Sequence, residues 1–140
     1  EQQALGGMIF NTGIGAKDPA MQLQGAEMMI ASGKIAPAEA GRFNLVAFQL
    51  ASGLQQHDKA RNYLQRAIDL GYTAPNVTID DLRMNMAESY FSEGRHPEGL
   101  AYLSDQIAKQ KAAGQPVDVR WYRRGVAIAY TNEIVPQVYD

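Results

Sequence analysis

The sequence predicts an all-α fold of about six to seven antiparallel helices. Alanine and glutamine, both good helix formers, are abundant in the 140 residues, and valine and isoleucine form no alternating run that would predict a strand. Apolar residues instead recur at helical spacing between prolines and glycines that mark helix starts and stops. A chain of this length with 46% hydrophobic residues is expected to form one globular domain over residues 1–140.

The first expected elements lie between residues 1 and 54. Residues 1–17 are predicted to be a flexible leader, or a short helix over Gln2–Ile9. Asp18 and Pro19 indicate a helix start, because an aspartate caps the first amides and proline fits the first helical position; this helix is expected to end near residue 32. Pro37 opens the next helix. Its apolar residues have the spacing of one buried face: Phe43, Val46, Ala47, Leu50 and Leu54.

Four further helices are expected after residue 54. One begins near Asp58 and ends at Gly71, which suits a left-handed C-cap. Tyr72–Ile79 contains proline and asparagine and is expected to be a loop. The remaining helices are predicted over residues 79–92, from Pro97 to about 112, and over residues 118–132.

These helices are organised by a repeat of 38 to 39 residues. At an offset of 39 the second helices of two pairs align: His57 with His96, Ala60 with Gly99, Tyr63 with Tyr102, and Leu64 with Leu103. At an offset of 38, Ala87 aligns with Gly125. The aligned small residues matter because a residue without bulk lets two helices approach closely. The sequence therefore predicts successive helix hairpins that nest against each other.

The spacing resembles the tetratricopeptide repeat, with its signature W-x2-L-G-x2-Y, then A-x3-F, then P. The best unit has Arg83, Met86-Ala87, Tyr90, Gly99 and Leu103; the preceding unit has Asn44, Ala47-Phe48, Ala51, Ala60 and Leu64; the last has Trp121, Gly125 and Ile128. Arg124 replaces the signature leucine, Phe48 is bulky at a small position, and the final proline is absent from both complete units.

The resemblance covers residues 36–132. It implies repeats over 36–71 and 79–112, the first helix of an incomplete or capping repeat over 118–132, and a partial repeat over 18–32. A right-handed α-α superhelix, a solenoid with a concave inner surface, is the implied architecture. The implied concave residues are Leu45, Gln49, Ser52, Met84, Glu88, Phe91, Tyr122, Val126 and Ala129.

Such a surface mixes aromatic, apolar and amide groups, which suits a peptide or a partner helix. The leading hypothesis is a non-catalytic protein-interaction scaffold without a cofactor. An enzyme or small-ligand carrier is the alternative, and it requires titratable groups to converge, for instance Glu88 with His96 or Arg123. A third hypothesis is a structural fragment whose groove is filled by its own tail.

No motif predicts a metal site or catalysis. His57 and His96 occupy matching repeat positions, where the tetratricopeptide family usually carries an aromatic residue that packs the turn, and no metal-ligand spacing accompanies them. Thr12–Lys17 is rich in glycine, but Lys17 is followed by Asp18 rather than by the serine or threonine of a phosphate loop. Neither the two histidines nor the glycine-rich stretch is expected to bind a metal or phosphate or to take part in catalysis.

The last helix offers two surfaces. Arg120, Arg123 and Arg124 fall within about 100° of one another, which predicts either an anion-binding patch or a solvated face. The opposite apolar arc is about 160° wide, more than one neighbouring helix covers. We expect it to be covered by a second copy of the chain, giving a homodimer through this helix, by residues 133–140, or by a region outside this sequence.

Composition excludes other classes of partner. A net charge of −2 argues against a large basic surface for nucleic acid, and no apolar run reaches the length of about 20 residues that a membrane span requires. The absence of cysteine is compatible with reducing and oxidising compartments alike, so the localisation stays unknown.

Overall fold

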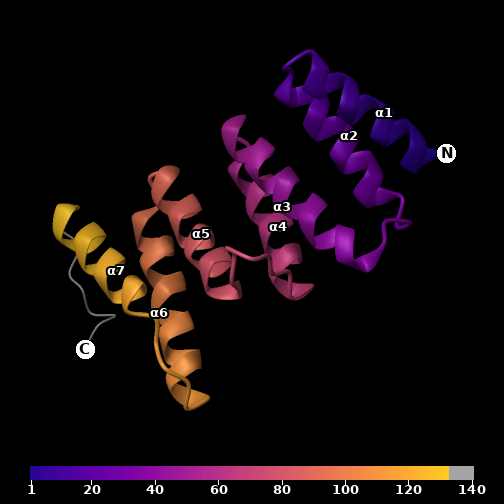
Figure 1. Ribbon diagram of the computed structural model, residues 1–140. Helices are drawn as coiled ribbons and strands as arrows, with labels where there is room; N and C mark the ends of the chain where they lie inside the picture. The colour runs from indigo at the N-terminus through magenta and orange to yellow at the C-terminus, as the bar shows by residue number, and fades with distance from the viewer. Residues whose placement is uncertain (133–140) are drawn as a thin grey trace. The chain divides into compact units, whose positions relative to one another are not determined.

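The computed structural model describes residues 1–132, and the fold there is all-α (Figure 1). In order, the helices of this described part are α1 (Gln2–Gly15), α2 (Pro19–Ala31), α3 (Pro37–Gly53), α4 (His57–Asp69), α5 (Ile79–Ser92), α6 (His96–Ala112) and α7 (Val119–Thr131). The only extended pairing within these residues is an isolated bridge between Ala74 and Val77. The predicted all-α class is confirmed, and α2 to α7 begin and end within one or two residues of the predicted bounds.

Local signals explain these bounds. The Asp18 side chain accepts a hydrogen bond from the Met21 amide at 3.1 Å, and Pro19 is the first residue of α2. Gly71 follows α4 with a φ of +67°, the left-handed conformation predicted for it. Helix starts and stops are thus determined by residues within one turn.

The N-terminal segment differs from the flexible leader or short helix expected over residues 1–17. It forms α1, a helix of 14 residues. Its glycines indicated flexibility in the sequence, but Gly6 and Gly13 are buried. A Cβ atom on Gly25 of α2 would lie 2.3 Å from the Phe10 backbone nitrogen. These glycines therefore allow the backbones of α1 and α2 to pack in close contact.

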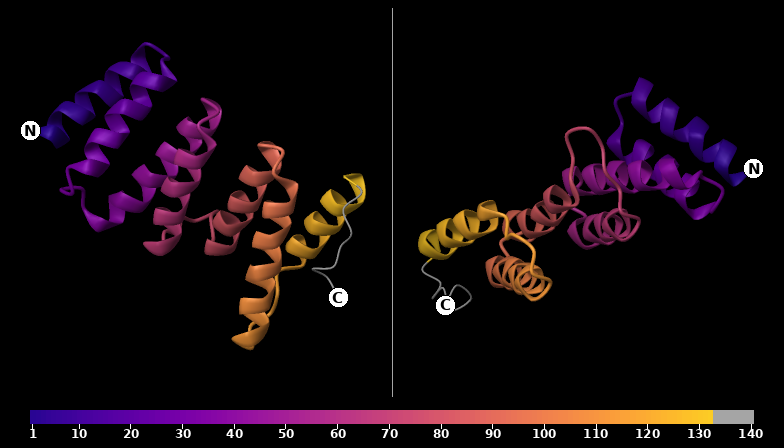
Figure 2. Two further views of the ribbon diagram at one scale, coloured as in Figure 1. Left: turned by 180° about the vertical axis from the view of Figure 1, so that it is seen from behind. Right: turned by 60° about the horizontal axis from the view of Figure 1, so that its bottom comes forward.

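The chain divides into two compact units, Glu1–Ile79 and Asp80–Asp140. In the first unit α1 packs against α2, α2 against α3, and α3 against α4. Figure 2 shows the α1–α2 and α3–α4 hairpins from two further sides. The core of this unit includes Leu23, Ala47, Ala51, Ala60 and Tyr63.

Small residues bring α3 and α4 together. Ala47 and Ala51 on α3 and Ala60 on α4 are completely inaccessible to solvent. Phe48 is only partly buried, so Ala47 and not Phe48 takes the small position in the α3–α4 hairpin. Alanine side chains therefore lie in the contact between the two helices of this hairpin.

In the second unit α5, α6 and α7 enclose one apolar cluster. Its buried members are Ala87, Phe91, Leu100, Leu103, Ile107, Trp121, Ile128 and Ala129. The Trp121 side chain is completely buried. A Cβ atom on Gly99 of α6 would lie 2.3 Å from the Phe91 ring of α5, so the ring occupies the space that the glycine leaves.

Candidate functional site

Helix α7 has one buried face and one exposed face. Its N-terminus is capped by Asp118, whose side chain accepts a hydrogen bond from the Arg120 amide at 2.9 Å. Trp121, Gly125 and Ile128, spaced three and four residues apart, are buried. The residues between them face elsewhere, and their surroundings decide what this helix can bind.

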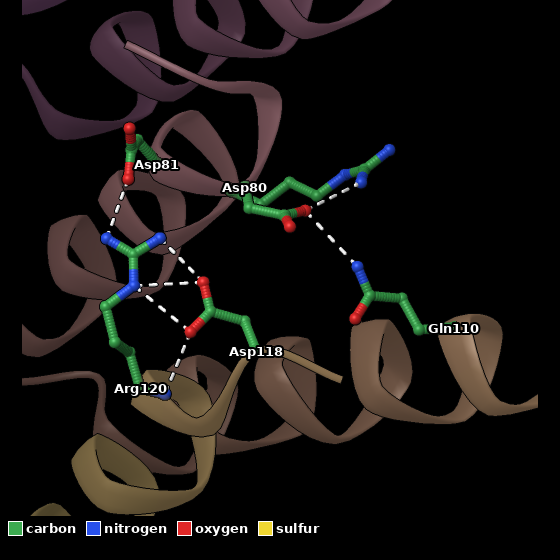
Figure 3. Close-up of polar contacts among 6 residues, drawn as sticks. Asp80, Asp81, Gln110, Asp118 and Arg120 are labelled. Carbon is green, nitrogen blue, oxygen red and sulfur yellow. Dashed lines mark hydrogen bonds and ion pairs between the residues drawn. The ribbon is translucent and has the colours of Figure 1, made fainter. Parts of the chain in front are cut away.

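A polar network joins the starts of α5 and α7 (Figure 3). The Arg120 guanidinium donates to an Asp118 oxygen at 2.6 Å and to an Asp81 oxygen at 2.7 Å. The hydrogen bond from Arg120 lowers the pKa of the Asp118 carboxyl group, because it stabilises the ionised form. Asp80, next in the chain, accepts a hydrogen bond from Gln110 of α6 at 3.2 Å. The network fixes three helix ends and leaves Arg120 neutralised by two carboxylates.

Arg124 is also paired within the unit. Its guanidinium donates two hydrogen bonds to the Glu88 carboxylate of α5, one of them from Nη2 to Oε2 at 3.0 Å. These hydrogen bonds raise the pKa of Arg124. The guanidinium carbon lies 5.6 Å from the centre of the Phe91 ring. The bidentate pair links α5 to α7.

The anion patch predicted from three arginines therefore does not form as expected. Arg120 binds carboxylates of α5 and of the loop before α7, and Arg124 binds a carboxylate of α5. The charges of both guanidinium groups are therefore neutralised. Arg123 is exposed and makes no ion pair with any residue in 1–132. Asp118 lies two residues before Arg120, but the acids of α5 that bind Arg120 and Arg124 lie 39 and 36 residues away in the chain.

Beside Arg123 lies an open hollow, which we call the α7 surface. Within the described chain it is lined by Tyr122, Arg123, Val126, Ala127, Tyr130 and Thr131. Val126 is 53% exposed and Tyr130 86% exposed. Tyr122, Val126 and Tyr130 are four residues apart and form one stripe along the helix. Lys111 of α6 adds a cation, with its Nζ 5.7 Å from the centre of the Tyr122 ring.

Of the predicted concave residues, Tyr122 and Val126 lie on the α7 surface. Met84 packs, like Tyr122, against the apolar cluster of the second unit. Phe91 and Ala129 are buried, which corrects their assignment to an exposed groove; Phe91 fills the space over Gly99, and Ala129 belongs to the same cluster.

The remaining predicted residues lie on α3 in the first unit. There Gln49 is exposed, while Leu45 and Ser52 are partly buried. Sequence reasoning missed Tyr130 and Lys111. Extending the four-residue spacing from Tyr122 and Val126 by one more step would have found Tyr130. Lys111 had no such signal, because it comes from another helix.

Within the described chain, the titratable side chains considered for an enzyme or small-ligand site do not lie together. Glu88 binds Arg124 rather than His96 or Arg123, the partners that the enzyme or ligand-carrier alternative requires. The His96 ring lies 6.1 Å from the Phe91 ring, and His57 is 3.0 Å from the Gln55 side-chain oxygen. A search of residues 1–132 for three or more His, Cys, Asp or Glu side chains able to hold a metal ion finds none. No helix in that part of the chain has the length and apolar character needed to cross a bilayer.

Comparison with protein-family models, curated proteins and solved structures finds no match to this chain.

Proposed function

We propose that this chain is a non-catalytic protein-interaction scaffold that binds a peptide or a partner helix on the α7 surface. The observation that carries the proposal is the stripe of Tyr122, Val126 and Tyr130, which keeps apolar and aromatic area exposed beside a hollow. Tyrosine is a favourable anchor, because it contributes a large contact area with few side-chain torsions to immobilise.

The proposed architecture is a right-handed solenoid of tetratricopeptide-like hairpins. Its support is the recurrence of small residues where paired helices meet: Gly25 against α1, Ala47 with Ala60, and Gly99 against Phe91. Such hairpins bury their apolar faces by stacking and leave an inner surface for ligands. The first helices of successive hairpins carry that surface. In this proposal α7 is the first helix of the last, incomplete repeat.

The alternative, an enzyme or small-ligand carrier, has weaker support. Two hollows in the first unit measure about 150 Å³ and about 270 Å³. Both are smaller than the roughly 300–1,000 Å³ of typical ligand pockets. The hollow of the α7 surface, at about 650 Å³, lies within that range, but it is open to solvent and does not enclose a small molecule. The smaller hollow is lined by Asn44, whose buried Oδ1 atom has no hydrogen-bond partner within the described chain.

The proposal is tested by selecting peptides from a displayed 12-residue library on the full chain. Selected peptides are then measured against Val126→Gln, which removes an apolar anchor from the α7 surface. Leu70→Gln is the matched control, since Leu70 is 52% exposed and Val126 is 53% exposed, and Leu70 lies on the other unit. We expect Val126→Gln to weaken binding about five- to tenfold and Leu70→Gln to leave it unchanged.

Circular dichroism first establishes that both variants keep the helical content of the parent. The proposal fails if no selected peptide distinguishes Val126→Gln from the parent chain. It also fails if a small metabolite stabilises the chain in a thermal-shift screen and no peptide binds.

A further inference from the structure

We infer that the segment bound on the α7 surface is acidic: it places a carboxylate beside Arg123 and Lys111 and apolar side chains against the tyrosine stripe. This inference rests on the proposed function and adds the chemistry of the partner.

The charge balance of α7 carries the inference. The helix has three arginines, and two of them are neutralised by carboxylates of their own unit. Arg123 alone makes no ion pair with residues 1–132, and it lies on the exposed hollow. Lys111 likewise makes no ion pair in the described chain and lies against the Tyr122 ring. Within residues 1–132, Arg123 and Lys111 are thus cations without an ion pair; Arg123 follows Tyr122 in the chain, and Lys111 lies against its ring.

Among the residues that the structure describes, the lining of the α7 surface contains no carboxylate. Its described residues are two tyrosines, one arginine, one valine, one alanine and one threonine. The nearest acids of α5 are occupied by Arg120 and Arg124. An incoming carboxylate thus meets positive charge without a competing acid among the described lining residues. Guanidinium and carboxylate groups form bidentate hydrogen bonds, which also orient the partner.

The same charges disfavour the other occupants of this surface. In a two-fold dimer built on α7, the Arg123 side chains of the two copies would face the same interface, and like charges would repel. Nucleic-acid binding generally needs a broad basic surface, whereas this chain has a net charge of −2, and within residues 1–132 Arg123 and Lys111 are the cations without an ion pair at the α7 surface. An acidic protein segment with apolar anchors fits both the charge and the stripe.

The experiment uses two displayed libraries with the same apolar pattern. One carries Asp and Glu at its charged positions, and the other carries Lys and Arg. The parent chain is expected to enrich the acidic library at least tenfold over the basic one, and Arg123→Glu is expected to reverse the preference. Arg66→Glu is the matched control, because Arg66 is also exposed and lies 5.3 Å from the centre of a tyrosine ring, that of Tyr63. The control should keep the acidic preference.

The outcomes separate the two proposals. If peptides bind and are lost with Val126→Gln, but Arg123→Glu leaves their charge preference unchanged, the acidic partner is refuted and the proposed function stands. If no peptide depends on Val126, both fail.

Other occupants are recognised by separate readouts. A dimer in sedimentation that Val126→Gln dissociates would assign the surface to a second copy and overturn the inference. Acidic peptides that bind a chain shortened after residue 132, but not the full chain, would assign the surface to residues 133–140 and overturn it as well. Binding of a duplex oligonucleotide that Arg123→Glu abolishes would assign it to nucleic acid.

Discussion

The contact between α1 and α2 gives the sharpest test of hairpin nesting. We predict that Gly25→Ala destabilises the chain while Gly7→Ala stabilises it. A Cβ atom on Gly25 would lie 2.3 Å from the Phe10 nitrogen and 2.6 Å from the Gly6 oxygen. Both neighbours are backbone atoms, so no side-chain rotation can relieve the overlap. At Gly7 the nearest atom to an added Cβ is the Met29 sulfur at 4.0 Å, an ordinary contact.

The magnitudes follow from two opposing effects. Replacing a helical glycine by alanine gains about 1 kcal/mol of helix propensity. At Gly25 the two helices must separate by roughly 1 Å, and overpacking of this kind costs about 3 kcal/mol. The net expectation is a loss of about 2 kcal/mol for Gly25→Ala and a gain of about 1 kcal/mol for Gly7→Ala. The first unit has the size of a small domain, so the loss lowers its midpoint temperature by about 10 °C.

The assay is urea and thermal unfolding followed by far-ultraviolet circular dichroism for the parent and both variants. Because the two substitutions are chemically identical, and both lie in helices of the first unit, their difference isolates the close backbone contact. Equal stabilities of Gly25→Ala and Gly7→Ala would refute the nesting of α1 on α2. A destabilised Gly7→Ala variant would show that the buried face of α1 is wrongly assigned.

Three further predictions concern the second unit. Removing the pair Arg124 and Glu88 in a double-mutant cycle should reveal a coupling of about 0.5 kcal/mol that falls in high salt, because both side chains are partly exposed; a coupling near zero in low salt would contradict the bidentate pair. The lowered pKa of Asp118 means that its contribution to stability is present above pH ~4 and is lost as pH falls through the lower folded-state value, so urea titrations of Asp118→Asn should show a weaker acid dependence than the parent. Burial raises the pKa of Tyr102 to about 12, so its stabilising effect is complete below pH ~10 and is lost as pH rises toward 12; Tyr102→Phe should remove this late step from an ultraviolet titration of phenolate formation, and an unchanged titration would disprove the burial.

The starts and ends of the helices could be predicted from the sequence, because they depend on residues close together in the chain. Asp18 with Pro19 predicted the start of α2, and Gly71 predicted the left-handed cap after α4, because caps and turns depend on residues within a few positions. The spacing of small residues also indicated that helices approach closely. The resemblance to the tetratricopeptide repeat implied a concave surface that includes Tyr122 and Val126, and both residues line the hollow of the α7 surface.

Tertiary packing decided the rest, because it joins residues that are distant in the chain. The glycines of α1 favour a flexible segment when only the neighbouring residues are considered. In the fold, α1 is a helix, and its glycines lie on the face that packs against α2. Three arginines on one helix look equivalent in sequence. The position of α5 supplies carboxylates to Arg120 and Arg124, whereas Arg123 makes no ion pair with residues 1–132. The periodicity of a single helix fixes which side chains share a face, but only the neighbouring helices determine which of those faces remain open.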